Sequence, residues 1–377
     1  MSLIKKVIQL DKKFWATALT LSGTMIGAGI LGLPYAFSKS GFASGIFWLV
    51  FLGLIMIYIN LCLAEITLRT KKLHQIPGYA EIYLGKWGKN LMLFAVFFGI
   101  YAALLAYLIG EGQSLSKLFF GTFEYSAYFA VGFWIVMTLL LRDGLEGLKK
   151  IESRNVLMII FLISFSFIFF LRNIKLENLA YHDFGNFFFP FGIVLFALLG
   201  FSSIPEMRAE ILKKEKFFKK AVIIGTLIPI SLYAVFSMTF LGSFGKEVTQ
   251  VATLSFGNFV PVLGVFTMFA SYFVLSFSLN NVFKLDLKRR DKAFFFVSII
   301  PLALYFFASF FKSINFASVL GIGGVVSGGL TIILILLMQM KAKKYGNRKP
   351  EFSVPMNWIL FGILSLIFAL GVLTEVF

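Results

Sequence analysis

Long apolar segments recur from one end of the chain to the other, and this recurrence restricts the possible folds more than any single motif does. A helix that crosses a bilayer needs about 20 mainly apolar residues, and eleven segments meet this requirement. The loops between them are short and leave no room for a soluble domain. The sequence therefore predicts an all-α membrane protein with a single transmembrane domain over residues 1–377. The predicted spans are 14–38, 43–68, 90–116, 125–141, 155–171, 184–212, 218–242, 254–284, 293–311, 315–340 and 356–376.

The composition excludes several other classes of protein. Hydrophobic residues make up 59% of the chain and charged residues 14%, against about 25% charged residues in soluble domains. Cys62 is the only cysteine, so an internal disulfide is impossible, and with only His74 and His182 a metal site is not expected. No nucleophile, base or metal cluster recurs at one depth of the spans, so we expect neither an enzyme nor a resident cofactor.

The net charge of +17 is distributed in a pattern that indicates membrane orientation and argues against nucleic-acid binding. Most Lys and Arg residues fall in every second loop, which is the asymmetry typical of cytoplasmic loops. The N-terminus is therefore predicted inside the cell and the C-terminus outside, with anionic lipid headgroups as partners of the basic loops. The basic loops lie within 5–13, 69–89, 142–154, 208–220, 284–292 and 341–349, and the opposite side carries Lys39, Lys117, Arg172, Lys175, Lys246 and Lys312.

The first span contains a cluster of glycines that predicts a break in its helix. The segment Gly23–Pro34 reads GTMIGAGILGLP and holds Gly23, Gly27, Gly29 and Gly32. Each glycine in a helix interior destabilises the helix by roughly 0.5–1 kcal/mol relative to alanine. Non-helical backbone at membrane depth is tolerated only where it is buried in protein or lines a cavity. The predicted break therefore marks a candidate binding site.

A second interruption is predicted in the sixth span, at Gly200–Pro205, because proline removes a backbone donor and clashes with the preceding turn. The first and sixth spans are five apart and cross the membrane in opposite directions. Matching interrupted segments in two halves indicate an inverted repeat and the binding site of a transporter. The first repeat is expected over 14–172 and the second over 184–340, with 356–376 as an additional helix.

Four motifs give the chain a resemblance to a known family. GTMIGAGILGLPYAF in the first span, AYLIGEG in the third, FALLGFSSIPE in the sixth and IGTLIPISLY in the seventh resemble the amino acid/auxin permease family of the amino acid–polyamine–organocation superfamily. This family includes bacterial tyrosine and tryptophan permeases and is related to sodium-coupled neutral amino acid transporters. The resemblance covers about the first two thirds of the chain, and it implies a LeuT-type fold and secondary active transport of amino acids.

The break in the first span would free backbone amides for the carboxylate of a substrate. A helix N-terminus favours an anion, and the resemblance implies that the amides of Gly27, Ala28 and Gly29 hold the carboxylate, with the hydroxyl of Thr24 close by. The alternative is that the glycines only permit close helix packing. The matching interruption in the sixth span favours the binding site.

The interruption in the sixth span would expose carbonyl groups for a substrate ammonium, since a helix C-terminus is partially negative. These carbonyls lie around Phe196, Ala197 and Leu199, and Phe201 and Ser202 would then border the substrate side chain. Phe201 could equally be one more packing phenylalanine among the 49 of the chain. In the third span, Tyr101 and Tyr107 either line the pocket or pack between helices.

The coupling ion is H⁺ or Na⁺. In sodium-coupled relatives, carbonyls of the first span and hydroxyls of the eighth hold the ion, and the matching positions are Gly23, Ile26 and Ser271. Tyr272 stands where a second hydroxyl is expected. Some proton-coupled relatives place a lysine of the fifth span there, and the segment 156–170 contains none.

A carboxylate inside the membrane is the other candidate for coupling, because such groups are costly and usually functional. Glu206, in the inner half of the sixth span, is favoured over Glu65, near the end of the second. Glu111 falls near the outer end of the third span, where an interfacial carboxylate paired with Lys or Arg is expected.

The sequence thus predicts a symporter of the cell membrane that imports neutral L-amino acids by alternating access, with a slight preference for aromatic substrates. The uncharged surroundings of the predicted site argue against acidic or cationic substrates. The alternative is a membrane sensor that binds an amino acid without transporting it.

Overall fold

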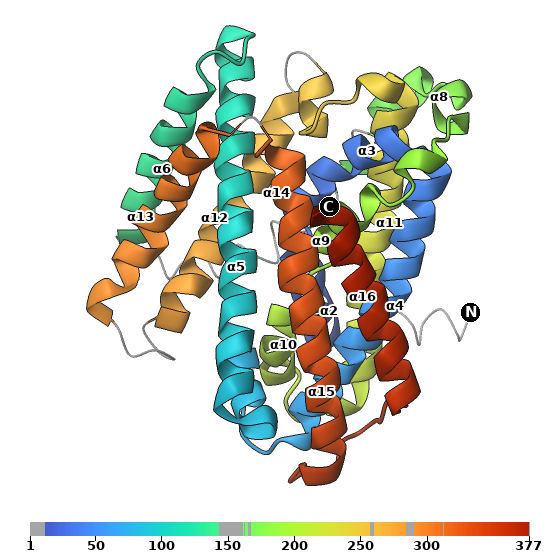
Figure 1. The fold of residues 1–377 in the computed structure, drawn as a ribbon, viewed down its shortest axis with the longest axis vertical. Helices are drawn as coiled ribbons and strands as arrows, with labels where there is room; N and C mark the ends of the chain where they lie inside the picture. Colours follow the sequence, from blue (N-terminus) through green and yellow to red (C-terminus); the bar gives the residue numbers. More distant parts are fainter. Residues whose placement is uncertain are drawn as a thin grey trace.

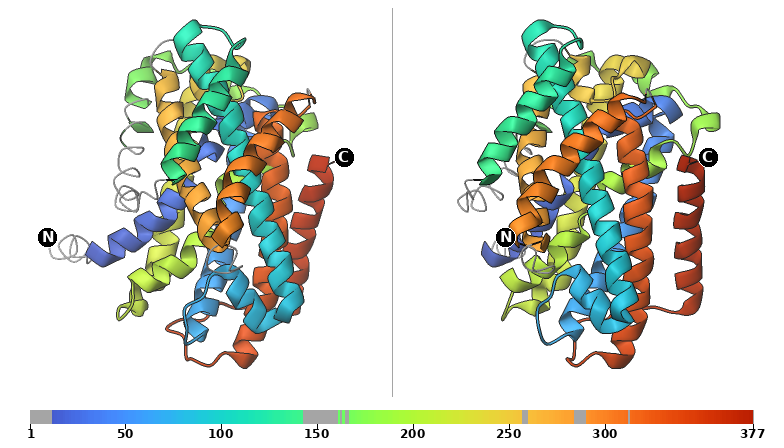
Figure 2. Two further views of the ribbon diagram at one scale, coloured as in Figure 1. Left: turned by 90° about the vertical axis from the view of Figure 1, so that its left-hand side faces the viewer. Right: turned by 60° about the vertical axis from the view of Figure 1, so that its left-hand side comes forward.

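The computed structural model describes residues 12–142, 161, 163–164, 167–256, 260–283, 290–311 and 313–376. Within these residues the regular structure is helical, and the only extended pairing is an isolated bridge between Gly41 and His182. The longest helices run along the long axis of an elongated bundle (Figures 1 and 2).

The first half of the described chain contains one bent helix pair and three further helices. The pair consists of α2 (Lys12–Met25) and α3 (Ala28–Ser40), whose axes differ by 56°. Then follow α4 (Phe42–Arg69), α5 (Ile76–Phe120) and α6 (Ser126–Arg142). The backbone of Gly85 leaves the helical conformation, with φ of 79°, so it separates a short first part of α5 from its long membrane part.

The second half contains the other interrupted segment and the remaining long helices. A short α8 (Leu176–Ala180) precedes α9 (Pro190–Ala197) and α10 (Ile204–Glu210), and α11 (Phe218–Phe244), α12 (Val260–Asn281) and α13 (Arg290–Ser309) follow. Next, α14 (Phe316–Gly323) continues through a π-helical turn (Gly324–Gly328) into α15 (Gly329–Tyr345). The last helix is α16 (Trp358–Val376).

Seven of these helical segments are long and apolar enough to cross a membrane, and the bent pair α2–α3 makes an eighth. Two shorter apolar helices, Ser126–Arg142 and Ala293–Ser309, lie where the sequence predicts two further spans. The fifth predicted span, 155–171, falls largely outside the described residues. The all-α membrane class is confirmed, and the count of eleven spans stays a prediction.

One end of the bundle gathers the loops that are rich in Lys and Arg. The loop between α4 and α5, the segment between α10 and α11, and the turn between α15 and α16 lie at the lower end in Figure 1. We call this end the basic end. The α3–α4 turn and α8 lie at the opposite end, where Gly41 has a φ of 96° and an added Cβ would lie 2.4 Å from the carbonyl oxygen of Tyr181.

Candidate functional site

The two interrupted segments touch each other in the interior of the bundle. The α-helical hydrogen bonding of α2 ends at Met25 and resumes in α3 at Ala28, and that of α9 ends at Ala197. A Cβ added to Gly29 would lie 2.5 Å from the Cα atom of Ala197. Only glycine at position 29 permits this approach, so the glycine cluster has a direct structural consequence.

A tyrosine of α11 connects the carbonyl ends of both segments. The hydroxyl of Tyr233 lies 2.6 Å from the carbonyl oxygen of Met25 and 2.9 Å from that of Ala197, and Tyr233 is fully buried. The final carbonyls of a helix lack partners within the helix. Because one hydroxyl has a single proton, the two carbonyls share Tyr233 as their donor.

A tyrosine of α5 covers the other side of the first break. The backbone N–H of Ala28 points at the hydroxyl oxygen of Tyr107, at an N to O distance of 3.5 Å. A Cβ added to Gly27 would lie 2.7 Å from this oxygen and 3.5 Å from Oγ of Ser271 in α12. Position 27 therefore has no space for a side chain.

A cavity of about 380 Å³ begins at these breaks and extends toward the basic end. Its volume falls within the range of about 300–1,000 Å³ that is usual for small-molecule sites. Near the breaks it is bordered by Gly27, Ala28 and Tyr107, and toward the basic end by Gln75 and Glu206. Toward the opposite end, α3, α9 and α14 pack closely: a Cβ added to Gly32 would lie 2.7 Å from the side chain of Leu320.

Many of the predicted site residues share this cavity. Its lining includes Thr24, Gly27, Ala28, Gly29, Tyr107, Phe196, Leu199, Phe201, Ser202 and Glu206. Residues at the lining that the sequence analysis missed include Gln75, Phe273, Phe277, Ser278 and Ser327. The missed lining residues come mainly from α5 and α12. Of these helices, α12 is apolar on all sides and so gives no periodic signal for its inward face.

Other predicted residues lie outside the lining. Ala197 contributes its carbonyl to Tyr233, and Tyr101 donates a hydrogen bond to the carbonyl oxygen of Phe296 in α13. Gly23 lies in the last turn of α2 and Ile26 directly follows that helix, next to the cavity-lining residues Thr24 and Gly27. Ser271 lies behind Gly27, beside the hydroxyl of Tyr107.

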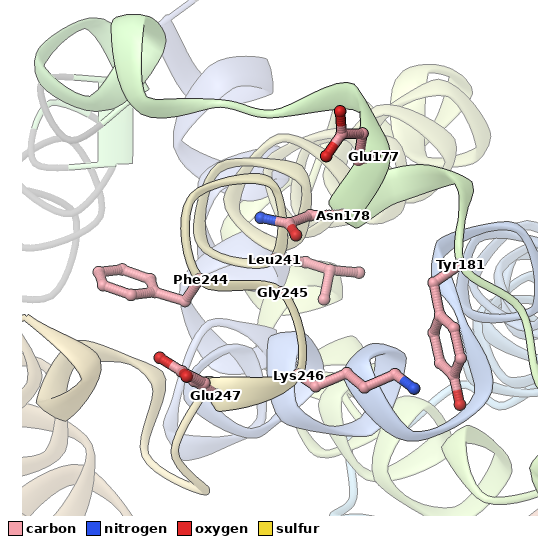
Figure 3. Close-up of a pocket in the computed structure, with 8 residues that line it drawn as sticks. All are labelled: Glu177, Asn178, Tyr181, Leu241, Phe244, Gly245, Lys246 and Glu247. Carbon is pink, nitrogen blue, oxygen red and sulfur yellow. The ribbon is translucent and has the colours of Figure 1, made fainter.

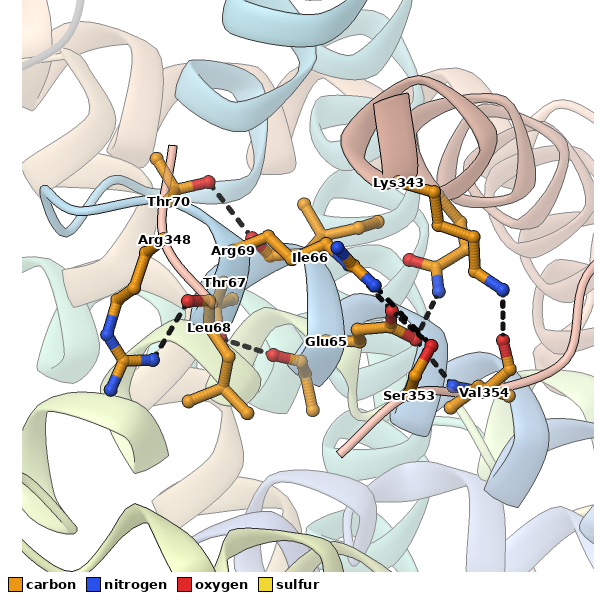
Figure 4. A network of polar contacts seen from close by, with 12 residues as sticks. Glu65, Ile66, Thr67, Leu68, Arg69, Thr70, Lys343, Arg348, Ser353 and Val354 are labelled. Carbon is orange, nitrogen blue, oxygen red and sulfur yellow. Dashed lines mark hydrogen bonds and ion pairs between the residues drawn. The ribbon is translucent and has the colours of Figure 1, made fainter. Parts of the chain in front are cut away.

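The two glutamates predicted for coupling have different surroundings. Glu206 is exposed and borders the cavity in α10. Glu65 is fully buried near the basic end, where Figure 4 shows its carboxylate facing the segment that precedes α16. Its oxygens accept hydrogen bonds from Arg69 (2.7 Å), Gln339 (2.6 Å), the Ser353 hydroxyl (2.9 Å) and the backbone N–H of Val354 (2.6 Å).

Another pocket, of about 370 Å³, lies at the opposite end between α8 and the end of α11 (Figure 3). Gly245, Lys246 and Tyr181 are among its lining residues. The ammonium of Lys246 lies 3.7 Å from the ring centre of Tyr181. Glu177 and Glu247 also border it, so it is a charged surface pocket without a helix break. Among the described residues, no group of three or more His, Cys, Asp or Glu side chains is arranged to hold a metal ion.

Comparison with known proteins identifies the family of the chain. The model of the tryptophan/tyrosine permease family matches residues 10–377. The chain belongs to this family. As a permease with at least seven apolar membrane-spanning helices, it is a multi-pass protein of the cell membrane.

Amino acid transporters are among the relatives of this permease. It is 26% identical to glutamine transporter 2 of Aliivibrio fischeri, over 88% of this chain and 90% of that protein. It is 29% identical to tyrosine-specific transport system 2 of Haemophilus influenzae, over 61% of this chain and 58% of that protein. A vacuolar amino acid transporter 2 of Saccharomyces cerevisiae is 26% identical, over 56% of this chain and 40% of that protein. The predicted resemblance to bacterial tyrosine and tryptophan permeases is confirmed.

Proposed function

We propose that this permease is a symporter that imports neutral L-amino acids by alternating access. The observation that supports the proposal most directly is the position of the cavity, which begins where the two interrupted helices meet. Helix ends inside a membrane protein offer amides to an anion and carbonyls to a cation. A zwitterionic amino acid needs both.

The substrate carboxylate is proposed to bind the amides at the start of α3, around Gly27, Ala28 and Gly29, near Thr24. The ammonium group is proposed to bind near the carbonyls of Phe196 and Leu199. The cavity lining supports this assignment, since these residues border one space.

The substrate side chain is proposed to extend toward Phe201 and Ser202, with the apolar side chains of α12 around it. Phe273 and Phe277 belong to the same wall. Such a wall favours neutral substrates and suits an aromatic ring, since aromatic rings bury a large apolar area. Relatives named for tyrosine and for glutamine fall within this neutral class.

The permease is proposed to adopt a LeuT-type fold, with repeats over 14–172 and 184–340 and eleven spans. The basic end is then cytoplasmic by the asymmetry of Lys and Arg, which places the N-terminus inside and the C-terminus outside. Because the cavity extends toward the basic end, the proposed conformation is inward-facing.

Transport is proposed to be coupled to H⁺ or Na⁺. A sodium ion would use the carbonyls of Gly23 and Ile26 with the hydroxyl of Ser271, which lies beside Gly27. A proton would use a carboxylate. Glu206 borders the cavity, whereas Glu65 lies outside the cavity lining and is held by its hydrogen-bond donors, so Glu206 is the stronger of these two candidates.

The test is uptake of labelled amino acids into liposomes that contain the purified permease, with a pH gradient imposed in one set and a sodium gradient in the other. Accumulation of neutral amino acids under either gradient is expected. Detectable binding without accumulation or exchange would contradict transport and favour a sensor, and conversion of the substrate would indicate an enzyme.

A further inference from the structure

A carboxyl group deep in α5 has no side-chain partner among the described residues. Glu111 is fully buried, and neither of its side-chain oxygens has a hydrogen-bond partner among the described residues. The sequence predicts an interfacial carboxylate paired with Lys or Arg, and the structure differs. Glu111 lies about 13 Å along the helix from the end of α5 at Phe120. The nearby Lys117 lies over the ring of Phe123 instead.

The surroundings of this carboxyl group are mainly apolar. A Cβ on the preceding residue, Gly110, would lie 2.6 Å from the sulfur of Met268 in α12 and 3.0 Å from the ring of Phe316 in α14. A Cβ on the following residue, Gly112, would lie 2.4 Å from the carbonyl oxygen of Ser126 in α6. The backbone N–H of Phe269 in α12 is the one polar group of that helix directed at the carboxyl among the described residues, and a neutral amide supplies no counter-charge. The part of α5 that carries the buried Glu111 thus packs against α6, α12 and α14.

The titratable side chains of the surrounding described helices do not supply a counter-charge. α5 itself carries Tyr79, Glu81, Tyr83, Lys86 and Lys89 near its start, followed by Tyr101, Tyr107 and Lys117. The other helices carry Tyr272 of α12, Tyr128 and Arg142 of α6, and Tyr35 and Lys39 of α3, and α14 has none. Arg142 is exposed at the far end of α6, Tyr128 is exposed, and Lys39 lies over the ring of Tyr35. No described cation forms an ion pair with Glu111.

An ionised carboxylate without a counter-ion is strongly destabilising when it is buried away from water. Moving an unpaired charge out of water is far more costly than moving a neutral polar group, so a buried group without a counter-ion takes up a proton. The conformation described here therefore requires Glu111 to be a neutral carboxylic acid. The same group would ionise once the packing of α5 against α12 and α14 opened to water.

Glu111 is also close to the first helix break. Tyr107 lies four residues before it on the same face of α5, one helical turn away. The hydroxyl of Tyr107 contacts the amide of Ala28 and borders the cavity. Tyr107 is thus a polar side chain of α5 that lies one turn from the buried carboxyl and at the space proposed for the substrate.

We propose that Glu111 binds the coupling proton of this permease. Its carboxylate takes one H⁺ from the side opposite the basic end when that side is open, and the resulting carboxylic acid permits α5, α12 and α14 to close over it. The proton leaves toward the cavity on the side of Tyr107 once the packing of α5 against α12 and α14 opens to water on that side, and this step regenerates the carboxylate before the next cycle. This inference rests on the proposed transport function and selects H⁺ as the coupling ion.

The test compares Glu111→Gln with the wild-type permease in liposomes without sodium and with the membrane potential held at zero. A pH difference of one unit supports up to about tenfold accumulation of a neutral substrate carried with one proton. Because glutamine resembles the protonated acid in shape, the variant is expected to exchange internal for external amino acid at equal pH. It is expected to lose accumulation under the pH gradient. Glu81→Gln is the matched control, since Glu81 is an exposed residue of α5 paired with Lys89, and it should accumulate substrate like the wild type.

Two outcomes would overturn the assignment. One is a Glu111→Gln variant that accumulates substrate under the pH gradient as the wild type does. The other is a wild-type permease that accumulates substrate only under a sodium gradient. This second result needs no variant, so it would refute proton coupling even if Glu111→Gln did not fold. Absence of both accumulation and exchange in the wild type would refute the transport function itself, and so would be distinguishable from failure of the proton assignment alone.

Discussion

The two helix breaks differ in how they are built. The first is abrupt: α2 stops at Met25, α3 starts at Ala28, and the two axes differ by 56°. The second is gradual, because the chain passes from the end of α9 at Ala197 through a 3₁₀ turn at Phe201–Ser203 into α10. The first therefore presents backbone to the cavity, while the second also presents large side chains.

This difference corresponds to the two parts of an amino acid. Every amino acid has the same carboxylate and ammonium groups, which backbone amides and carbonyls can bind without distinguishing substrates. Side chains differ, and phenylalanines such as Phe196 and Phe201 can distinguish them by fit. We therefore expect changes at the first break to affect all substrates and changes at the second to affect them unequally.

The largest effect is expected for Gly27→Val. The Cβ atom would lie 2.7 Å from the hydroxyl oxygen of Tyr107, and the branched side chain would occupy the proposed carboxylate position. Binding of every amino acid should weaken by a factor of about 100 or more, equivalent to about 2.7 kcal/mol. Equilibrium binding of labelled amino acids to the purified protein measures this, and unchanged affinity would remove the first break from the proposed site.

A smaller effect, on stability, is expected for Gly29→Ala. The added Cβ would lie 2.5 Å from Cα and 2.7 Å from Cβ of Ala197, atoms that cannot move without shifting α9. Overpacking of this kind costs about 1–3 kcal/mol, so the thermal midpoint should fall. Gly132→Ala in α6 is the matched control, since nothing lies within 4 Å of its Cβ position, and it should leave the midpoint unchanged or raise it. Equal midpoints for Gly29→Ala and the wild type would mean that the two breaks do not touch tightly.

The connection between the breaks is tested by Tyr233→Phe. Loss of the hydroxyl leaves the carbonyls of Met25 and Ala197 without this donor, and an unsatisfied buried polar group costs about 1–3 kcal/mol. Unfolding in denaturant should show this loss. Tyr272→Phe should cost less, because Tyr272 is equally buried but its hydroxyl makes no hydrogen bond to the described residues. Similar losses for both variants would mean that Tyr233 contributes packing and not a connection.

Tyr233 also illustrates what the sequence could predict. It ends the motif IGTLIPISLY, so the sequence identified its segment, just as the glycines and Pro205 located both breaks. Its two hydrogen bonds could not be predicted, because they depend on how α11 is rotated about its axis. Membrane helices that are apolar on all sides do not encode that rotation as periodicity. For the same reason Tyr101 and Tyr107 appeared equivalent, although Tyr107 lies at the cavity and Tyr101 bonds to α13.

The most selective effect, and the smallest for amino acids as a whole, is expected for Phe201→Ala at the second break. Phe201 borders the cavity and is 6% exposed, so its ring forms part of the proposed side-chain wall. A single methylene group in an apolar pocket is worth about 1–3 kcal/mol, or roughly 10- to 200-fold in specificity, and Phe201→Ala removes a whole ring. The KM for aromatic amino acids should therefore rise by at least about tenfold, whereas the KM for small aliphatic ones should change less, since they do not reach the wall. Competition between labelled tyrosine and alanine for uptake measures the ratio directly. An equal loss for both substrates would mean that the second break, like the first, supports binding of the shared amino acid groups and does not select the side chain.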